Sequence, residues 1–318
     1  MGSPATLPVE DAACLFCPTA PWAEIGRGRD YEYDTVPDLF TLRRCTGCGL
    51  VFVAPRPGPA AMRVIYPSNY YAYREEEIER PLLKRFRDRI EGGKVRRYRR
   101  LVADDTAAVV DVGCGDGRLL DILRRLGPSG WHLAGIEVAE AAARRAAERG
   151  FEVRTGDLET LDLTRWNGRF GLALVHQVIE HTRDPRDAVR RIARLLRPGG
   201  VLSVETPDTR GWDARIFRRG YWGGYHIPRH FYLFDASTLS RLLVEQGFEV
   251  VSVRSILSPA FWVYSVHNAL ADSPRLRRLA RWFHAQSPLP MAVAAAIDVV
   301  QIATRRQSTN LQLLARKP

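Results

Sequence analysis

Three glycines alternate with other residues at the junction between an apolar run and an amphipathic run. The stretch from Val109 to Leu120 reads VVDVGCGDGRLL, and its glycines are Gly113, Gly115 and Gly117. Glycine lets a ligand approach the backbone closely, and the N-terminus of a following helix presents unpaired N–H groups to it. This spacing therefore predicts a loop that binds a polar ligand through its main chain.

Carboxylates lie at the expected ends of the neighbouring strands. Glu137 ends the second strand, twenty positions after Gly117, and Asp157 ends the third. A carboxylate after the second strand can accept both hydroxyls of a ribose, because ligands of open α/β sheets bind at these strand ends. The dinucleotide fingerprint needs a glycine at position 118, which is Arg118 here. The glycines, Glu137, Asp157 and Asp111 together predict an adenosine pocket that lacks a loop for binding a pyrophosphate. Each acid taken alone also fits a helix cap.

A family resemblance follows from these motifs. The stretch from Val109 to Ile256 resembles class I S-adenosylmethionine-dependent methyltransferases, and FGLALVHQVIEHTRDP with LLRPGGVLSVETPD looks like their ubiquinone-biosynthesis type. The resemblance implies that the glycine loop and His176 meet the methionine part of the donor, that Glu137 holds the ribose and that Asp157 lies by the adenine. Cys114 is expected to be a small packed residue of the loop. The expected donor-binding residues are Asp111, Gly113, Cys114, Gly115, Glu137, Asp157, Leu158 and His176.

Histidines gather in two loops that should open at the same edge of the sheet. His176 and His181 follow the fourth strand, whereas His226 and His230 follow the fifth. The pKa of histidine suits a general base that removes a proton from a methyl acceptor. His181, beside Glu180, is the first candidate and His230 the second, so the predicted catalytic residues are His181, His230 and Glu180. The alternative for each histidine is a loop residue bonded to a backbone carbonyl.

A catalytic metal is the less favoured interpretation of the loop after the fourth strand. Some relatives that methylate hydroxyl pairs carry a Glu-x-x-Glu-His cluster that binds magnesium. Here Gln177 replaces the first carboxylate, which removes a charge from a hard-cation site. The aromatic segment YHIPRHFYLF, preceded by Trp212, Tyr221 and Trp222, is interpreted as a wall of the substrate site, with a packed cover of the sheet edge as the alternative.

Four cysteines form two C-x-x-C pairs near the N-terminus, at Cys14, Cys17, Cys45 and Cys48. Four thiolates at this spacing predict a tetrahedral structural Zn²⁺ site in a zinc ribbon. The rival interpretations are a redox dithiol and a set of disulfides, which a reducing compartment disfavours. The order of zinc ribbon, helical linker and glycine loop is similar to that of sugar C-methyltransferases, but a second nucleotide-sugar-binding domain is not found at the C-terminus.

Alternating elements must position these residues. Between residues 105 and 255, apolar β-branched runs alternate with amphipathic helical runs, which predicts βαβ units. The expected fold class is α/β, with a Rossmann-like, mostly parallel seven-stranded sheet, helices on both faces and a small N-terminal zinc-ribbon module. The predicted domains are the zinc-ribbon module at 1–58, a helical linker or lid at 59–104, and the methyltransferase domain at 105–318 with a helical apolar insertion at 256–308. In the linker, Tyr70, Tyr71 and Tyr73 are expected to close over the donor.

Composition limits the partners. The 318 residues carry a formal net charge of +11, which favours anionic partners, and the basic run Lys84–Arg100 is either a phosphate contact or a solvated helix face. The N-terminus has no basic or apolar signal-peptide region and no stretch is long enough to span a membrane, so a cytoplasmic location is expected. RLRRLARWF, at 275–283, has the arginine and tryptophan content of an interfacial helix, with a core or dimer contact preferred. A peripheral membrane or lipid contact and a homodimer are left open.

The sequence thus predicts an enzyme that transfers a methyl group from S-adenosylmethionine to an oxygen or an activated carbon. The acceptor is expected to be a small, anionic or lipid-like metabolite, and no stable nucleic acid partner is expected. One alternative is an RNA methyltransferase that uses the zinc ribbon and the basic linker to bind RNA. Another is a scaffold that keeps the fold without catalysis, against which the intact set from Gly113 to Asp157 argues.

Overall fold

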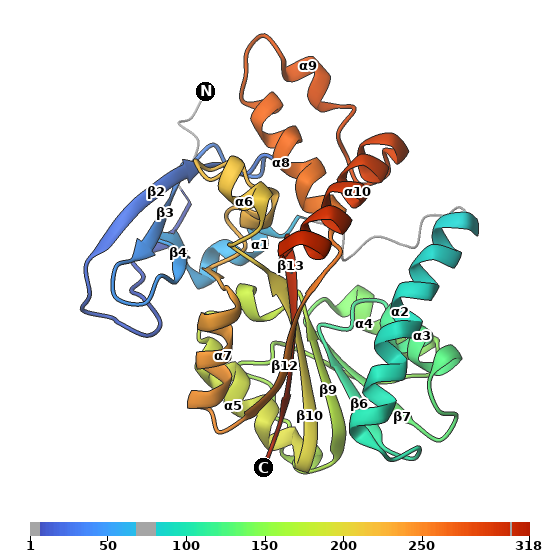
Figure 1. Ribbon diagram of the computed structural model, residues 1–318. Coiled ribbons are helices and arrows are strands. Elements are labelled where there is room, and N and C mark those ends of the chain that lie inside the picture. Colours follow the sequence, from blue (N-terminus) through green and yellow to red (C-terminus); the bar gives the residue numbers. More distant parts are fainter. Residues whose placement is uncertain (1–6, 68–80, 306) are drawn as a thin grey trace. The chain divides into compact units, whose positions relative to one another are not determined.

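A seven-stranded sheet with the order β12-β13-β10-β9-β6-β7-β8 runs through the computed structural model, which describes residues 7–67, 81–305 and 307–318 (Figure 1). Its strands are β6 (Ala108–Val112), β7 (His132–Glu137), β8 (Glu152–Thr155), β9 (Phe170–His176), β10 (Leu196–Pro207), β12 (Glu249–Ile256) and β13 (Asn310–Arg316). β6 pairs in parallel with β7 and with β9, and β7 pairs in parallel with β8. The predicted Rossmann-like, mostly parallel sheet is confirmed.

The central strands are apolar along their whole length. β9 reads FGLALVH, and six of its seven residues are buried. Parallel strands covered on both faces have continuous apolar runs, so this pattern, rather than an alternating one, is what a central position requires. At the carboxyl ends of β6, β7 and β9 the chain turns polar, and the candidate site residues begin there.

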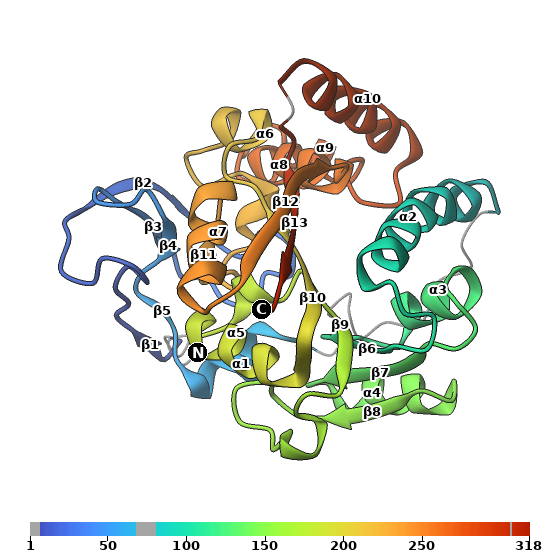
Figure 2. The same ribbon diagram turned by 60° about the horizontal axis from the view of Figure 1, so that its bottom comes forward.

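Helices cover both faces of the sheet. They include α2 (Pro81–Val102), α3 (Arg118–Leu126), α4 (Glu140–Glu148), α5 (Pro185–Leu195) and α7 (Ala236–Glu245). Figure 2 shows α5 on one face of the strands and α2 and α3 on the other. Val95 and Tyr98 of α2 join Leu120 of α3 in one hydrophobic core with the strands. The helix predicted as a linker therefore packs against the sheet.

The chain forms two compact units. Among the described residues, the first unit comprises 7–67, 205–241 and 253–312 except 306. The second unit comprises 81–204, 242–252 and 313–318. Strands β10, β12 and β13 carry residues of both units. The domain limits predicted at residues 58 and 104 stay a prediction, and the tyrosines at 70, 71 and 73 lie outside the described residues.

The first unit contains a four-stranded antiparallel sheet of order β11-β4-β3-β2. Its strands are β2 (Trp22–Gly28), β3 (Phe40–Cys45), β4 (Val51–Val53) and β11 (Tyr232–Leu233), beside a small pair of β1 (Val9–Glu10) with β5 (Arg56–Pro57). Short helices follow at η1 (Pro59–Ala61), α1 (Met62–Ile65), α6 (Trp212–Ile216) and η5 (Gly223–Tyr225). Leu42 and Val53 of the N-terminal strands share a core with Trp222 and Ile227, so distant segments of the chain build this unit together.

Three helices near the C-terminus complete the first unit: α8 (Pro259–Ala271), α9 (Arg277–Ala280) and α10 (Pro288–Arg305). Trp262 and Val263 of α8 pack against Ala294 of α10 in a small core of their own. Among the residues that the structure describes, no helix combines the length and the apolar content that crossing a membrane requires.

Candidate active site

The glycine loop that follows β6 uses conformations and space that only glycine provides. Gly113, Gly115 and Gly117 have φ values of +75°, +56° and +86°. A Cβ atom built on Gly113 would lie 2.5 Å from Cγ2 of Val178, which follows β9. L-residues rarely adopt such φ values, and the neighbouring side chain leaves no room, so both constraints select glycine at position 113.

The Glu137 carboxylate at the end of β7 is tied to the loop. Its Oε2 accepts a hydrogen bond from the Gly115 N–H at 2.8 Å, and its Oε1 accepts one from the Ala139 N–H at 2.8 Å. Burial raises the pKa of Glu137, and the two backbone N–H groups oppose that rise. Each carboxylate oxygen can accept a further hydrogen bond, so the group is oriented and still able to receive hydroxyl donors.

Two further residues, one in β6 and one in the loop, are buried near the end of that strand. Asp111 is buried within the strand itself. The Cys114 side chain packs against β7 so closely that a Cβ atom on Gly135 would lie 2.4 Å from its sulfur. Burial raises the pKa of the Cys114 thiol well above its usual range. A buried, protonated thiol is a packing group and not a nucleophile.

The turn after β8 contains Asp157 and Leu158. Asp157 is exposed, and its Oδ1 accepts a hydrogen bond from the Glu159 N–H at 2.9 Å. Leu158 is buried beside it. The turn thus places a carboxylate and an apolar side chain next to each other at the strand end.

His176, the last residue of β9, belongs to a small polar cluster. Its Nε2 lies 3.2 Å from the Ser203 hydroxyl and 3.4 Å from the Tyr98 hydroxyl, and these two hydroxyls are 3.1 Å apart. Tyr98 comes from α2 and Ser203 from β10, and the sequence analysis singled out neither. Gln177 follows with φ of +56°, an uncommon value for a residue other than glycine. The chain therefore turns sharply just after His176.

The candidate bases are divided between the two units. Glu180 and His181 lie in the 3-10 turn η4 (Ile179–His181) of the second unit, where Glu180 is fully buried and His181 is partly exposed. His230 belongs to the first unit. Its Nδ1 lies 2.8 Å from the Gly224 carbonyl oxygen, to which it donates. That bond makes Nε2 the proton-accepting nitrogen of the neutral His230 ring.

A second histidine of the first unit carries a carboxylate partner. His226 Nδ1 lies 2.9 Å from Glu32 Oε1, and both side chains are largely buried. The rings of His226 and His230 are 5.0 Å apart. Next to them Arg229 pairs with Asp30 at 2.8 Å, and both side chains of that pair are fully buried. This network holds the loop between η5 and β11 in place.

The four N-terminal cysteines converge. Their sulfur atoms all lie within 4.8 Å of one another, and none of these cysteines is in a disulfide. Zinc–sulfur bonds of about 2.3 Å in a tetrahedron place sulfurs about 3.8 Å apart, so the cluster fits a Zn²⁺ ion. Gly49, with φ of +79°, closes the turn beyond Cys45, whose carbonyl accepts the Gly49 N–H at 2.9 Å.

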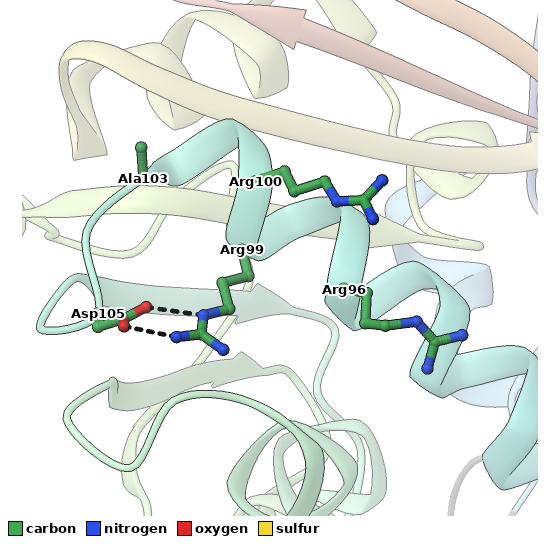
Figure 3. Close-up of a pocket in the computed structure, with 5 residues that line it drawn as sticks. All are labelled: Arg96, Arg99, Arg100, Ala103 and Asp105. Carbon is green, nitrogen blue, oxygen red and sulfur yellow. Dashed lines mark hydrogen bonds and ion pairs between the residues drawn. The ribbon is translucent and has the colours of Figure 1, made fainter.

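A basic groove lies on α2. A cavity of about 600 Å³ is lined by Arg96, Arg99, Arg100, Ala103 and Asp105. Figure 3 shows Arg99 pointing to Asp105, whereas Arg96 and Arg100 point away from that pair. Arg99 donates to Asp105 through Nε at 3.0 Å and Nη2 at 2.8 Å. The other two guanidinium groups give the groove a net positive charge.

Comparison with known proteins identifies the family. A family model described as a methyltransferase domain matches residues 71–253. The ubiquinone biosynthesis O-methyltransferase of Caulobacter vibrioides is 38% identical over 104 residues, which are 31% of this chain and 40% of that protein. The protein of the same name from Albidiferax ferrireducens is 35% identical over 104 residues, with the same shares. The alignments therefore span less than half the length of these relatives.

A solved structure agrees with the fold. A chain in the Haloferax volcanii complex that contains the Trm112 methyltransferase activator has 16% identity and a TM-score of 0.50, over 74% of this chain and 92% of that chain. At this identity the likeness shows a shared fold alone. Because the family model covers more than half of the 318 residues, the chain belongs to this methyltransferase-domain family and carries a class I S-adenosylmethionine-dependent methyltransferase domain.

Proposed function

We propose that this protein transfers a methyl group from S-adenosylmethionine to an oxygen or an activated carbon of a small molecule. The observation that carries the proposal is the pairing of the Glu137 carboxylate with the Gly115 N–H inside the glycine loop. Family membership supports the donor. The names of the relatives, ubiquinone biosynthesis O-methyltransferases, support oxygen as the accepting atom.

The residues around the loop fit the donor. Val178 packs so closely against Gly113 that no Cβ atom fits there, which keeps the loop main chain bare, and the buried Glu137 carboxylate is oriented to accept ribose hydroxyls. We assign Asp157 and Leu158 to the adenine, and His176 with Asp111 to the methionine part. The Cys114 side chain packs between the loop and β7. Bound S-adenosylmethionine would supply a methyl group already activated on a sulfonium.

The protein's remaining task is to align the acceptor and to take its proton. We assign removal of the acceptor's proton to His181, because this residue follows the central strand β9 and is partly exposed, beside the buried Glu180. His230 is the second candidate, because its Nδ1–H bond to Gly224 makes Nε2 a proton acceptor. General-base catalysis of this kind contributes about a hundredfold or more to a rate.

The acceptor is assigned to anionic or lipid-like metabolites. Arg96 and Arg100 give the α2 groove a positive charge, and the chain as a whole carries +11. Such a field concentrates anionic ligands near the protein. The same groove is the observation that favours RNA as a second candidate substrate, since guanidinium groups also bind a phosphate backbone.

The zinc site is assigned a structural role in the first unit. Its four ligands are all cysteines, and a site with four protein ligands has no open position for a substrate. Two cysteines precede β2 and two lie at the end of β3, where Trp22 pairs with Cys45, so a bound ion would fix the open end of this hairpin. We therefore propose that the four cysteines and the β2–β3 hairpin form a zinc ribbon.

The test is a comparison of small molecules labelled by a methyl-labelled donor in cell extracts with and without the protein. We expect one or a few labelled metabolites that disappear with Glu137→Ala and persist with Glu140→Ala, an exposed glutamate nearby. Label in RNA would instead favour the RNA methyltransferase. A folded protein that does not bind S-adenosylmethionine at millimolar concentration would overturn the proposal and leave a scaffold.

A further inference from the structure

Two polar side chains of helix α10 lie inside the first unit. Asp298 and Gln301 are fully buried within the first unit. Asp298 accepts hydrogen bonds from the Ser258 N–H at 2.9 Å and the Trp262 Nε1–H at 3.1 Å, and Gln301 Oε1 accepts the Trp212 N–H at 2.8 Å. The helix is thus anchored by a satisfied polar face, which is the reverse of an ordinary surface helix.

The outer face of α10 is apolar along its length. Leu289 is 73% exposed, and Val293, Val299 and Val300 are each at least half exposed. Residues 289, 293, 296 and 300 recur at helical spacing and form one stripe, with exposed alanines at 292, 296 and 303. Between 288 and 303 the only charged residue is the buried Asp298. Contiguous apolar surface of this kind marks a contact with a protein, a membrane or an apolar ligand.

The segment before α10 adds tryptophan and positive charge. Leu276, Leu279 and Trp282 recur every third residue and are 46%, 48% and 61% exposed. Interleaved with them are four exposed arginines, at positions 275, 277, 278 and 281. No acidic residue occurs from 273 to 297, and within the described chain none of these arginines forms an ion pair.

This segment is held in place rather than trailing in solvent. His267 of α8 has its Nδ1 at 3.0 Å from the Ala280 carbonyl oxygen and 3.1 Å from that of Phe283. Ala280 is buried, and Phe283 packs into the core of these helices. Figure 1 shows α8, α9 and α10 as one cluster. We call the exposed side chains of residues 275–300 the α9–α10 face.

We infer that the α9–α10 face binds the surface of an anionic phospholipid membrane. The apolar stripe and Trp282 enter the boundary between headgroups and acyl chains, while the arginines reach the lipid phosphates. The helices lie along the membrane, because none of the described helices is able to cross one. A second copy of the chain fits less well, since a two-fold contact would bring the arginines of both copies together. The inference is independent of methyl transfer.

The experiment is sedimentation with vesicles of phosphatidylcholine, with and without phosphatidylglycerol. We expect binding to the anionic vesicles that weakens with salt and is lost on vesicles without the anionic lipid. Removing two charges with R277Q and R281Q should weaken binding by about tenfold or more, and replacing Trp282 and Leu289 by serine should do the same. The matched controls are R144Q with R165Q, two exposed arginines of the second unit, and serine at the exposed Leu39 and Val244.

Several results would overturn the inference. They are absence of binding to anionic vesicles, an equal loss in the control variants, and a dimer in light scattering that only the face variants dissociate. In the last case the occupant is a second copy of this chain. Thermal unfolding and donor affinity of each variant establish that it is folded. Because vesicle binding needs no methyl acceptor, its failure is distinguishable from failure of the proposed methyl transfer.

Discussion

Glu137 joins the ends of two neighbouring strands by accepting the N–H of Gly115 at 2.8 Å. The bond connects the glycine loop after β6 to the carboxyl end of β7, inside the second unit. Its partner bond from Ala139 fixes the other oxygen at 2.8 Å. The loop conformation and the orientation of the carboxylate that we assign to the ribose therefore depend on each other, and a change in one should alter the other.

Replacing Glu137 by alanine leaves the partly buried N–H groups of Gly115 and Ala139 without their acceptor. The substitution also removes the carboxylate that we assign to the ribose hydroxyls. A hydrogen bond to a charged group contributes about 1.5 to 3 kcal/mol, so we expect the affinity for S-adenosylmethionine to fall by about a hundredfold. Glu137→Gln should be intermediate, because an amide accepts one of the two bonds and its NH₂ opposes the other donor. Isothermal calorimetry with S-adenosylmethionine measures the change, and Glu140→Ala is the matched control. Unchanged affinity in Glu137→Ala would remove this residue from the donor site.

Gly113→Ala and Gly150→Ala separate backbone strain from steric exclusion. Both glycines have positive φ, but a Cβ atom meets Val178 only at position 113 and meets nothing within 4 Å at position 150. We expect Gly150→Ala to cost about 1 to 2 kcal/mol of stability with unchanged donor affinity. Gly113→Ala should cost more and weaken donor binding, and adding Val178→Ala should restore part of both. Denaturant unfolding and calorimetry measure the two effects; equal costs at both positions would exclude the steric contribution.

The sheet and the donor loop were predictable from the sequence because their signals are local. Apolar β-branched runs fix the strands, and parallel strands bring their carboxyl ends to one edge. Gly113, Gly115 and Glu137 each stand immediately after such a run. Once the strands are recognised, the closeness of these residues follows from the architecture.

Tyr98 and Ser203 escaped the sequence analysis because their contact is not local. Tyr98 lies 78 positions before His176, in a strongly basic helix. The available signal was the spacing of Val95 and Tyr98, which places both on one face of α2 and predicts burial. Ser203 lies inside the apolar strand β10, where a single hydroxyl carries no periodic signal.

The aromatic rings of segment 225–234, which contains β11, are buried, which favours the alternative of a packed cover over a substrate wall; a role of the segment toward a substrate stays a prediction. Trp222, Phe231 and Phe234 are essentially unexposed, and Trp222 packs in the core of the first unit. The physical reason is that the N-terminal strands need an apolar cover, and β11 supplies it by pairing with β4. Local composition identifies such a segment as apolar but does not identify its partner.

Cysteine substitution tests the zinc site. Burial raises the pKa of Cys14 and Cys48, whereas backbone N–H groups of Cys48 and Gly47 lower the pKa of Cys45 to about 7 against the effect of burial, so Cys45 is the cysteine that most readily becomes a thiolate. We expect Cys45→Ser to lose bound zinc and to unfold the first unit at lower temperature, because metal binding is coupled to folding. Metal analysis and thermal unfolding measure this, with Cys114→Ser as the control that retains zinc. Purified protein that is metal-free, folded and insensitive to chelators would contradict the assignment.

Asp213 predicts a pH dependence of stability. Its Oδ2 accepts the Trp222 Nε1–H at 2.5 Å, and burial raises the pKa of Asp213 from 3.8 to about 7. Between these values the folded protein binds a proton that the unfolded chain does not. Its contribution to stability is therefore complete below about pH 4 and is lost as the pH rises to about 7.

Asp213→Asn keeps an acceptor for Trp222 and cannot titrate. We expect the variant to lose a slope of up to about 1.4 kcal/mol per pH unit in the free energy of unfolding between about pH 4 and 7. Burial also raises the pKa of Asp298, to about 6, so part of the slope remains. Denaturant titrations across this range measure the difference against Asp11→Asn, which removes an exposed carboxylate. Identical slopes in wild type and Asp213→Asn would show that Asp213 is ionised throughout.

His181 is the last assignment to test, and it separates proton removal from donor binding. His181→Ala removes the proposed base but none of the residues assigned to the donor, so we expect turnover to fall by about a hundredfold with donor affinity nearly unchanged. Added imidazole should restore part of the rate, since it replaces the missing proton acceptor but not a structural side chain. His132→Ala, at an exposed position on β7, is the matched control. Full turnover in His181→Ala would make that assignment wrong and move the test to His230, whose Nε2 is the proton-accepting nitrogen of its neutral ring.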